Sequence, residues 1–280
     1  MNSTIDHPDY LVLGHLTHDR LPDGSSTAGG TVLYAGLTAQ RLGMRTAVFT
    51  AAAAVPAQLI ELDYVHLLAS KSTTTFENRY AEDGRSQWLH TLAPPLDMRQ
   101  LPPSWLTAPV VHFGPLVNEF SLDLLHTFPH ALIGVTPQGW MRMWQDPLPA
   151  TVHRISWLPP PDLLQRIGLL VLSIEDLGGD DRLARVYARA CRLVALTRGA
   201  QGATLFIEGE PHQLAAFSAQ ERDPTGAGDV FTAAMLVALA RGQTPLDAAR
   251  FAAATAALAV EGAGTSCIPV LDTVLARIRR

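Results

Sequence analysis

Short apolar runs alternate with longer alanine-rich or amphipathic stretches along most of the chain. The apolar runs predict β-strands at Tyr10–Leu13, Ala47–Thr50, Val110–Phe113, Ala131–Val135, Leu169–Leu172, Leu193–Thr197 and Ala203–Ile207. Several of them are apolar at almost every position, as in strands whose sheet is covered by helices on both faces. The alternation of strands with helical stretches predicts an α/β fold.

Helix boundaries are clearest in the C-terminal third. A glycine-rich turn precedes an apolar helix predicted from about Asp229 to Ala240, and a second alanine-rich helix follows it. Thr244 directly before Pro245 is a favourable helix start, and Gly262 shortly after Val260 is a favourable stop. Nearer the N-terminus, another helix is predicted to begin after Gly30.

A β-hairpin is predicted in the first half of the chain. Residues 73–80 and 85–90 flank the sequence Ala81-Glu82-Asp83-Gly84. An Asp-Gly pair between two such segments is a strong hairpin signal, because both residues tolerate the backbone angles of a tight turn.

Composition narrows the class of protein. The chain has 280 residues, of which 48% are hydrophobic and 17% charged, enough for one large core, so a single domain over residues 1–280 is expected. The proline-rich stretches 93–103 and 158–161 are predicted as loops, since neither is long enough for an interdomain linker. A formal net charge of -5 lacks the basic excess of a nucleic-acid-binding protein.

The cellular compartment is predicted from cysteine content and apolar stretches. Cys191 and Cys267 form neither a disulfide framework nor a Cys-x-x-Cys zinc motif. The polar first ten residues do not resemble a signal peptide, and the longest apolar stretches are too short for a membrane span. We therefore expect a soluble cytoplasmic protein with no membrane partner.

The most informative motif is the run Asp223-Pro224-Thr225-Gly226-Ala227-Gly228-Asp229-Val230-Phe231. Small residues at the start of a helix leave backbone N–H groups open to an anion. A carboxylate beside such a site suits a base that takes a proton from a hydroxyl while the amides stabilise a transferring phosphoryl group. The alternative interpretation is an ordinary helix N-terminus with a favourable acid in its first turn.

This run resembles the D-T-x-G-A-G-D signature of the PfkB/ribokinase family of carbohydrate and nucleoside kinases. The resemblance implies a ribokinase-like three-layer α/β/α sandwich with a small β lid, and ATP-dependent phosphorylation of an alcohol. It assigns Asp229 as catalytic base and Gly226, Ala227 and Gly228 as the anion hole, with ATP, Mg²⁺ and a monovalent cation as cofactors. Pro224 departs from the family, which usually has Thr there, so contacts around Asp223 are expected to differ.

Two N-terminal segments resemble the family's acceptor-binding elements. Gly14-His15-Leu16-Thr17-His18-Asp19 is similar to a G-x-x-x-x-D element, and Gly29-Gly30 is similar to a substrate loop. The resemblance implies that Asp19 binds substrate hydroxyls, for which an acceptor-only carboxylate is suited, and that backbone approaches substrate at Gly29 and Gly30. Asp19 as a simple turn residue is the alternative.

A lid over the sugar is implied at residues 16–26 together with the hairpin of residues 73–91. Asn78, with its neighbours Phe76 and Tyr80, would then contact substrate. An exposed hairpin with no ligand role is the other interpretation. A cover would exclude water, which competes as a phosphoryl acceptor.

The nucleotide side resembles the family's strand-end T-x-G-x-x-G. Thr197, Gly199 and Gly202 carry this likeness, and the Arg198 guanidinium is a natural phosphate partner or else a solvated surface group. Ser173-Ile174-Glu175-Asp176 occupies the place of the family's N-x-x-E, so Glu175 and Asp176 are the candidate residues for Mg²⁺, with a helix N-cap as the alternative.

The acceptor is the least determined feature. Short matches to plant-type inositol kinases, such as Thr136-Pro137-Gln138-Gly139-Trp140-Met141-Arg142 beside their D-x-Q-G-x-x-R, favour a sugar or a cyclic polyol such as myo-inositol. A nucleoside kinase, or a non-catalytic sugar or nucleotide sensor, remains an alternative, and a homodimer stays open. The chain has no Walker motif and no H-E-x-x-H, and His15 and His18 are expected to be loop residues rather than metal ligands.

Overall fold

The structure, a computed structural model, describes residues 7–81 and 84–279. Its centre is a nine-stranded sheet in the order β16 (Glu210–Leu214), β15 (Ala203–Ile207), β14 (Leu193–Thr197), β13 (Leu169–Ser173), β9 (Leu132–Val135), β8 (Val110–Phe113), β1 (Tyr10–Leu13), β4 (Thr46–Ala52) and β5 (Tyr64–Ala69). The strands pair in parallel from β14 to β5, whereas β15 is antiparallel to β14 and to β16. The sheet is therefore mixed, and its parallel strands end at one common edge.

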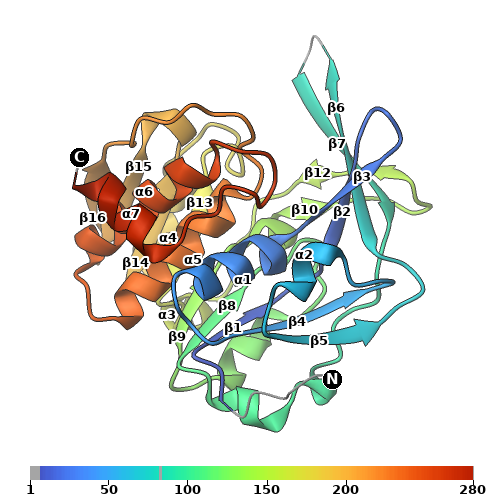
Figure 1. Ribbon diagram of the computed structural model, residues 1–280, viewed down its shortest axis with the longest axis horizontal. Helices are drawn as coiled ribbons and strands as arrows, with labels where there is room; N and C mark the ends of the chain where they lie inside the picture. The colour runs from blue at the N-terminus through green and yellow to red at the C-terminus, as the bar shows by residue number, and fades with distance from the viewer. Residues whose placement is uncertain (1–6, 82–83, 280) are drawn as a thin grey trace.

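Helices cover both faces of this sheet (Figure 1). One face carries α1 (Thr31–Arg41), α2 (Ala57–Ile60), α5 (Ala227–Ala240), α6 (Pro245–Ala259) and α7 (Leu271–Ile278). The other face carries α3 (Pro161–Arg166), α4 (Arg182–Tyr187) and the short 3-10 helices Pro103–Thr107 and Leu122–Thr127. Further 3-10 turns lie at Met98–Gln100, Gln138–Met141 and Gly199–Gln201. The predicted α/β class, with a sheet covered on both sides, is confirmed.

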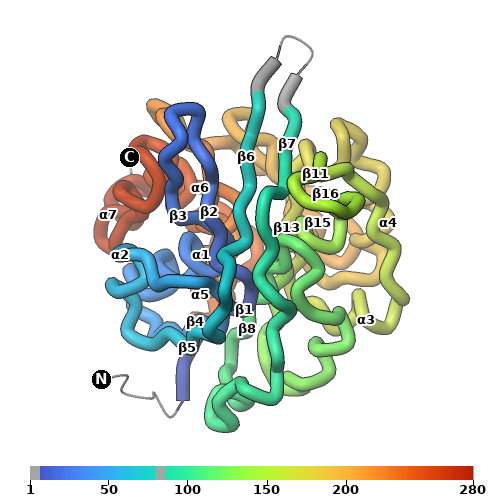
Figure 2. Tube along the Cα trace, turned by 90° about the vertical axis from the view of Figure 1, so that its right-hand side faces the viewer, coloured from blue at the N-terminus to red at the C-terminus, as the bar shows by residue number. Residues whose placement is uncertain are grey.

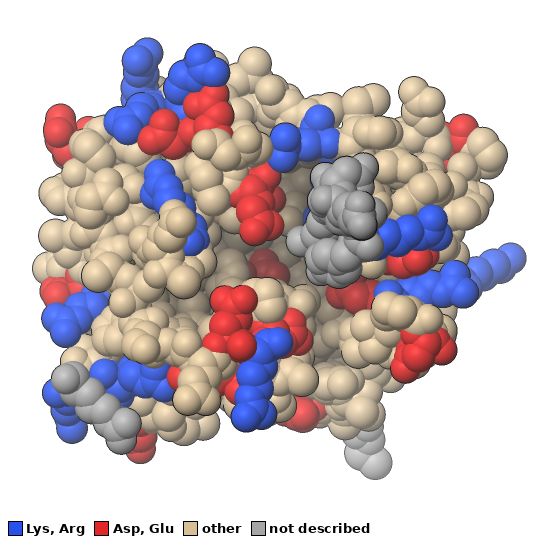
Figure 3. All heavy atoms as spheres, turned by 90° about the horizontal axis from the view of Figure 1, so that it is seen from above, with Lys and Arg blue, Asp and Glu red and all other residues tan. Residues whose placement is uncertain are grey.

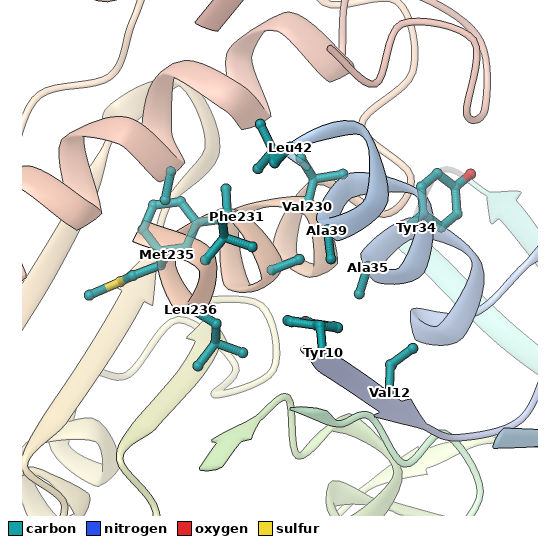
Figure 4. Packing of buried hydrophobic residues seen from close by; sticks show 14 of the residues in the cluster. Tyr10, Val12, Tyr34, Ala35, Ala39, Leu42, Val230, Phe231, Met235 and Leu236 are labelled. Carbon is teal, nitrogen blue, oxygen red and sulfur yellow. The ribbon is translucent and has the colours of Figure 1, made fainter. Parts of the chain in front are cut away.

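The two cores differ in the size of their side chains. On the α1 and α5 face, small residues let the helices lie close to the sheet, and Figure 4 shows Tyr10 and Val12 of β1 beneath these helices. On the opposite face, Trp140 stacks on Trp157 at 5.3 Å between ring centroids, and Tyr187 follows at 5.5 Å from Trp157. Large aromatic rings fill this layer because its helices are short and leave more space above the sheet.

A second, five-stranded sheet stands beside the first. Its order is β11 (Ala150–Thr151), β7 (Gly84–Thr91), β6 (Thr74–Ala81), β2 (Thr17–Arg20) and β3 (Ser26–Gly29). In Figure 2 the long β6–β7 hairpin rises above the body of the molecule, with β2 and β3 along its side. Two short strands, β10 (Arg142–Met143) and β12 (His153–Arg154), pair nearby. The two segments expected to form a lid, 16–26 and 73–91, thus contribute neighbouring strands of one sheet.

Most predicted elements occur at the expected positions. All of the predicted strands are present within a few residues of their expected ends, and the predicted hairpin is confirmed by the pairing of β6 with β7. The Thr244 side chain accepts a hydrogen bond from the Asp247 amide at 3.2 Å, so it caps α6 as its sequence position indicated. Part of the predicted Asp-Gly turn, Glu82 and Asp83, lies outside the described residues.

Among the helices that the structure describes, none is both long and apolar enough to cross a membrane.

Candidate active site

The helix α5 begins with a turn that only glycine can form at its first position. Gly226 has φ 75°, in the left-handed region, and a Cβ there would lie 2.3 Å from the Tyr34 ring of α1. A Cβ at Gly228, in contrast, would meet nothing within 4 Å. The backbone at Gly228 is therefore open to an approaching ligand.

The predicted anion hole needs one adjustment. The Ala227 amide donates to the Pro224 carbonyl at 3.1 Å, so it is already used within the turn. Within the described part of the chain, the amides of Gly226, Gly228 and Asp229 have no hydrogen-bond acceptor. These three N–H groups, at the positive end of a helix of 14 residues, are the ones left for an anion.

Asp229 lies in the first turn of α5 with part of its surface exposed. Burial raises the pKa of its carboxyl group to about 7, a hydrogen bond from the Thr31 side chain opposes this rise, the charge of Asp176 adds to it, and Arg142 opposes it. A carboxylate with a pKa near neutrality can both accept and release a proton at working pH. Figure 3 shows a hollow in this face of the molecule, with acidic side chains around and inside it.

Thr31 contacts Asp229 because α1 begins where the chain packs closely against the loops that follow β1 and β8. Gly30 has φ 95°, and a Cβ there would lie 2.5 Å from the His15 carbonyl oxygen. A Cβ at Gly114 would lie 2.2 Å from the Thr31 side chain. The two glycines thus let the start of α1 lie against the loops that follow β1 and β8. Thr31 directly follows the glycine pair in the sequence, but only the fold shows that it contacts Asp229.

Asp19 lies on β2 of the five-stranded sheet, and its carboxylate lies directly over the backbone of Gly29. A Cβ at Gly29 would lie 2.7 Å from Asp19 Oδ2 and 3.2 Å from Thr17 Oγ1. Strands β2 and β3 pair Thr17 with Gly29 and Asp19 with Thr27, so Thr17, Asp19 and the backbone of Gly29 share one face of the sheet. The atoms closest to Gly29 and Gly30 therefore belong to the protein itself. They are the Asp19 and Thr17 side chains at Gly29 and the His15 carbonyl at Gly30.

The face of the β6–β7 hairpin that shares Asp19's side of the sheet is apolar near its base and polar further out. Phe76 and Leu89 are buried against Leu116, while Asn78 Oδ1 accepts a hydrogen bond from the side-chain Nε2 of Gln87 at 3.1 Å. Parallel pairing places Phe76 beside Asp19. Asn78 is therefore on the same face as Asp19, one step further along the hairpin.

Arg142 lies near both this hairpin and the Asp229 carboxylate. Its guanidinium carbon lies 5.2 Å from the Phe76 ring centroid, and Nη1 donates to the Leu116 carbonyl at 3.4 Å. Its positive charge lowers the pKa of Asp229. Arg142 was predicted only as part of a motif, because the sequence does not show that its side chain lies near both Phe76 and Asp229.

A buried carboxylate fixes the loops beneath the hairpin. Glu119 is 1% exposed and accepts hydrogen bonds from the amides of His15 at 2.8 Å, Leu116 at 2.9 Å and Val117 at 2.9 Å. The His15 ring bonds Thr74 Oγ1 at 2.9 Å and the Pro94 carbonyl at 3.0 Å. His15 is thus a structural residue, and no group of three or more His, Cys, Asp or Glu side chains positioned to hold a metal occurs among the described residues.

The candidate metal residues have different environments. Asp176 accepts from the Ser173 amide at 2.9 Å and from the Gln138 side chain at 3.3 Å, and its charge reaches Asp229. Its own amide donates to Ser173 Oγ at 3.1 Å, but residues 174–179 form turns and α4 begins only at Arg182, so Ser173 does not cap a helix as the alternative required. Glu175 is exposed, and only its backbone carbonyl has a described contact, with Arg154 at 2.9 Å. The structure therefore associates Asp176, and not Glu175, with the Asp229 carboxylate.

The predicted nucleotide residues are used in the β14–β15 turn. The Arg198 amide donates to the Gly202 carbonyl at 2.8 Å, and Gly199 and Gly202 have φ 53° and 85°. Arg198 Nη1 donates to Thr204 Oγ1 at 2.7 Å, and Thr197 Oγ1 donates to the Leu172 carbonyl at 3.2 Å. An open cavity of about 560 Å³ adjoins this turn and is lined by Ile174, Gly179, Asp180, Asp181, Arg182, Arg198 and Gln201.

Asp223, the neighbour of Pro224, holds the turn before α5 through two hydrogen bonds. Asp223 accepts from the Thr225 amide at 2.9 Å and from the Gly264 amide at 2.8 Å. Burial raises the pKa of Asp223, but these hydrogen bonds outweigh it, so the net shift is downward. The turn before α5 is therefore fastened to the loop after α6 by an ionised carboxylate.

Parts of the sequence are similar to known proteins. Residues 176–271 match the pfkB family carbohydrate kinases. Over 80 residues the chain is 46% identical to the bifunctional protein HldE of Caulobacter sp. (strain K31), a match that covers 28% of this chain and 16% of that protein. Over 84 residues it is 42% identical to the ribokinase of Arabidopsis thaliana, covering 29% and 22%. The chain thus spans less than a quarter of the length of these relatives.

Solved structures are similar over nearly the whole chain. A pyrophosphate-dependent kinase in the ribokinase family has a TM-score of 0.78 at 24% identity, covering 96% of this chain and 99% of the other. A pyrophosphate-dependent myo-inositol-1 kinase, converted to a myo-inositol-3 kinase by two substitutions, has a TM-score of 0.73 at 23% identity over 96% and 98%. Arabidopsis thaliana ribokinase complexed with ribose and ATP has a TM-score of 0.74 at 22% identity over 98% and 99%. At these identities the likeness shows the ribokinase fold over nearly the whole chain, while the match to the pfkB family carbohydrate kinases covers residues 176–271.

Proposed function

We propose that this protein transfers a phosphoryl group from a phosphoanhydride donor to a hydroxyl of a sugar or cyclic polyol. One observation carries the proposal: a partly exposed carboxylate, Asp229, has a pKa near 7 beside three backbone amides that have no acceptor in the described chain. A proton acceptor and an anion-binding helix end in one place are the two requirements of phosphoryl transfer to an alcohol.

The reaction follows from this arrangement. Asp229 accepts the proton of the attacking hydroxyl, whose oxygen forms a new bond to phosphorus as the bond from phosphorus to the donor's leaving oxygen breaks. The amides of Gly226 and Gly228 stabilise negative charge on the phosphoryl oxygens. Thr31, hydrogen-bonded to Asp229, fixes the orientation of the carboxylate.

On the acceptor side, Asp19 is proposed to bind hydroxyls, with Asn78 on the same face of the hairpin sheet. A carboxylate only accepts hydrogen bonds and can hold two hydroxyls at once, which suits a polyol. A similar structure is a myo-inositol kinase and another is a nucleoside kinase, so myo-inositol and nucleosides are the acceptors to compare. We favour the polyol, because the Asp19 carboxylate is suited to neighbouring hydroxyl groups.

Two donors need testing. ATP is the donor in the ribokinase complex, and pyrophosphate is the donor of other similar structures. The β14–β15 turn favours neither donor, because Arg198 Nη1 donates to Thr204 Oγ1 while Arg198 also lines the open cavity beside the turn. The anion site at α5 serves either donor, since both present phosphoryl oxygens.

Mg²⁺ fits the residues present, because the carboxylates of Asp176 and Asp229 lie near enough for one charge to raise the pKa of the other group. Asp176, acting directly or through water, would hold the ion beside the phosphates, where it would neutralise their charge. The loop joined by Asp223 to Gly264 is the place that we propose for a monovalent cation, since a similar solved structure, a fructokinase, is in a potassium-bound form. Both cysteines are free thiols, which suits a reducing cytoplasm.

The experiment is a matrix of donors and acceptors. ATP and pyrophosphate are each paired with inositols, hexoses, pentoses and nucleosides, and formation of ADP or phosphate is followed with and without acceptor. Asp229→Asn should lose about a hundredfold or more in turnover, the range for loss of a general base. Asp272→Asn, on an exposed residue of α7, is the matched control. Binding of donor and acceptor without turnover in the unaltered protein would indicate a sensor instead.

A further inference from the structure

Three polar side chains form a buried row beneath the start of α5. The Tyr10 hydroxyl lies 2.8 Å from His112 Nδ1, and His112 Nε2 lies 3.2 Å from Thr136 Oγ1. Tyr10 and His112 are 0% exposed, and Thr136 is 9% exposed. None of the three has a part in the mechanism above, although buried polar groups are costly to retain.

The direction of the hydrogen bonds along this row is fixed by counting donors. The Tyr10 hydroxyl has no other partner in the described chain, so it satisfies its proton by donating to His112 Nδ1. A neutral imidazole that accepts at one nitrogen carries its proton on the other. Nε2–H of His112 therefore donates to Thr136 Oγ1.

His112 is held in the neutral state. Burial lowers its pKa to about 3, and among the described residues the ring nitrogens have Tyr10 and Thr136 as their hydrogen-bond partners. The imidazole thus carries one N–H proton at neutral pH, and the hydrogen bond from Tyr10 decides which ring nitrogen holds that proton.

Thr136 lies at a place in the fold where the direction of its hydrogen bond with His112 decides what its hydroxyl can offer to a ligand. It follows β9 at the edge where the parallel strands end, in the same short segment as Gln138, which contacts Asp176, and Arg142, whose charge reaches Asp229. Its hydroxyl oxygen already accepts from His112, so its own proton is left to donate. In the described chain no other group accepts it.

We infer that the buried Tyr10–His112 pair orients the Thr136 hydroxyl as a hydrogen-bond donor to a hydroxyl oxygen of the acceptor bound in front of Asp229. The inference rests on the proposed function for the identity of that ligand. It makes Thr136 a specificity-determining residue and Tyr10 and His112 positioning residues. The assignment complements the carboxylates of Asp19 and Asp229, which only accept, because a polyol hydroxyl offers lone pairs as well as a proton.

The orientation is tested first without any ligand. Protein labelled with ¹⁵N at histidine reports which ring nitrogen of His112 is protonated, and the His112 signals are identified by their shift in Tyr10→Phe. We expect the Nε2–H tautomer in the unaltered protein and a mixture of tautomers in Tyr10→Phe. The Nδ1–H tautomer in the unaltered protein would overturn the inference.

Binding is tested with substitutions that keep shape. Thr136→Val removes the hydroxyl and should raise the acceptor KM about tenfold with kcat little changed, whereas Thr136→Ser should restore it. Tyr10→Phe should raise the same KM severalfold. Tyr187→Phe removes another buried tyrosine hydroxyl, one that donates to the Trp157 carbonyl on the far face of the sheet, and should leave KM unchanged.

The outcomes separate the two proposals. Equal acceptor KM values for Thr136→Val and the unaltered protein would overturn the role of Thr136 while leaving the kinase activity established. Absence of turnover in the unaltered protein with every donor and acceptor would remove the proposed function, and the tautomer measurement on the same sample would still decide the direction of the hydrogen bonds.

Discussion

Replacing Asp229 by Asn should stabilise the protein while abolishing its activity. The folded chain holds this carboxyl group with a pKa of about 7, against an ordinary value of 3.8. Above pH 7 the folded protein therefore keeps an ionised group in a place where burial disfavours its charge. Asn is neutral, has nearly the same shape, and can still accept the hydrogen bond from Thr31.

The size and sign of this effect follow from proton linkage. Between pH 4 and pH 7 the folded state binds a proton at Asp229 that the unfolded state has released, so the free energy of unfolding falls as pH rises. The full slope is ~1.4 kcal/mol per pH unit, or ~4 kcal/mol across the interval. Because the carboxylate retains some solvent contact, we expect about half of this, ~2 kcal/mol, as the advantage of Asp229→Asn at pH 8.

Urea unfolding followed by tryptophan fluorescence at pH 5 and pH 8 measures this advantage. The difference between Asp229→Asn and the unaltered protein should grow from pH 5 to pH 8, whereas Asp272→Asn, at an exposed position in α7, should show no such growth. A difference that is absent at pH 8, or equal at both pH values, would refute the assignment of a raised pKa to Asp229.

Two further predictions concern the same turn. The kcat/KM for the acceptor should fall about tenfold per pH unit below pH 7, because only ionised Asp229 can accept the proton, and a pH profile that is flat from 5.5 to 8 would contradict this. Gly226→Ala should cost roughly 2–4 kcal/mol of stability, since it combines a left-handed φ with a Cβ 2.3 Å from the Tyr34 ring. Gly228→Ala should keep or slightly raise stability, because its Cβ meets nothing, yet lose about a hundredfold in turnover by obstructing the anion site. Thermal unfolding and steady-state rates of the two variants check this contrast, and equal stability losses would contradict it.

The fold was largely predictable from apolar runs. Strands such as Tyr10–Leu13 and the first four residues of Leu193–Thr197 are apolar because both of their faces are buried, so these strands are visible in the sequence. Edge strands were missed: β5 (Tyr64–Ala69) and β16 (Glu210–Leu214) include exposed or half-buried polar positions, and their patterns do not differ from those of loops. The start of α5 was predicted within two residues, because glycine and the acid mark it directly.

The site was predictable only where one short segment contains it. Asp229 and its glycines are contiguous, so their chemistry could be inferred from spacing. Thr31 and Arg142 were not assigned, since their contacts with Asp229 join segments far apart in sequence. The Ala227 amide could not be judged from residue type, because its bond to the Pro224 carbonyl depends on the path of the backbone.

Direct observation of the product is the most decisive test of the account. ³¹P NMR of the protein with Mg²⁺, a donor and an acceptor shows whether a new phosphate monoester forms, and repeating it with Asp229→Asn shows whether this carboxylate is required. We predict a monoester resonance with at least one sugar or cyclic polyol, and none above background in the variant over the same time. A monoester formed equally fast by Asp229→Asn, or hydrolysis of the donor with no monoester from any acceptor, would contradict the assignment of this site as an alcohol phosphotransferase.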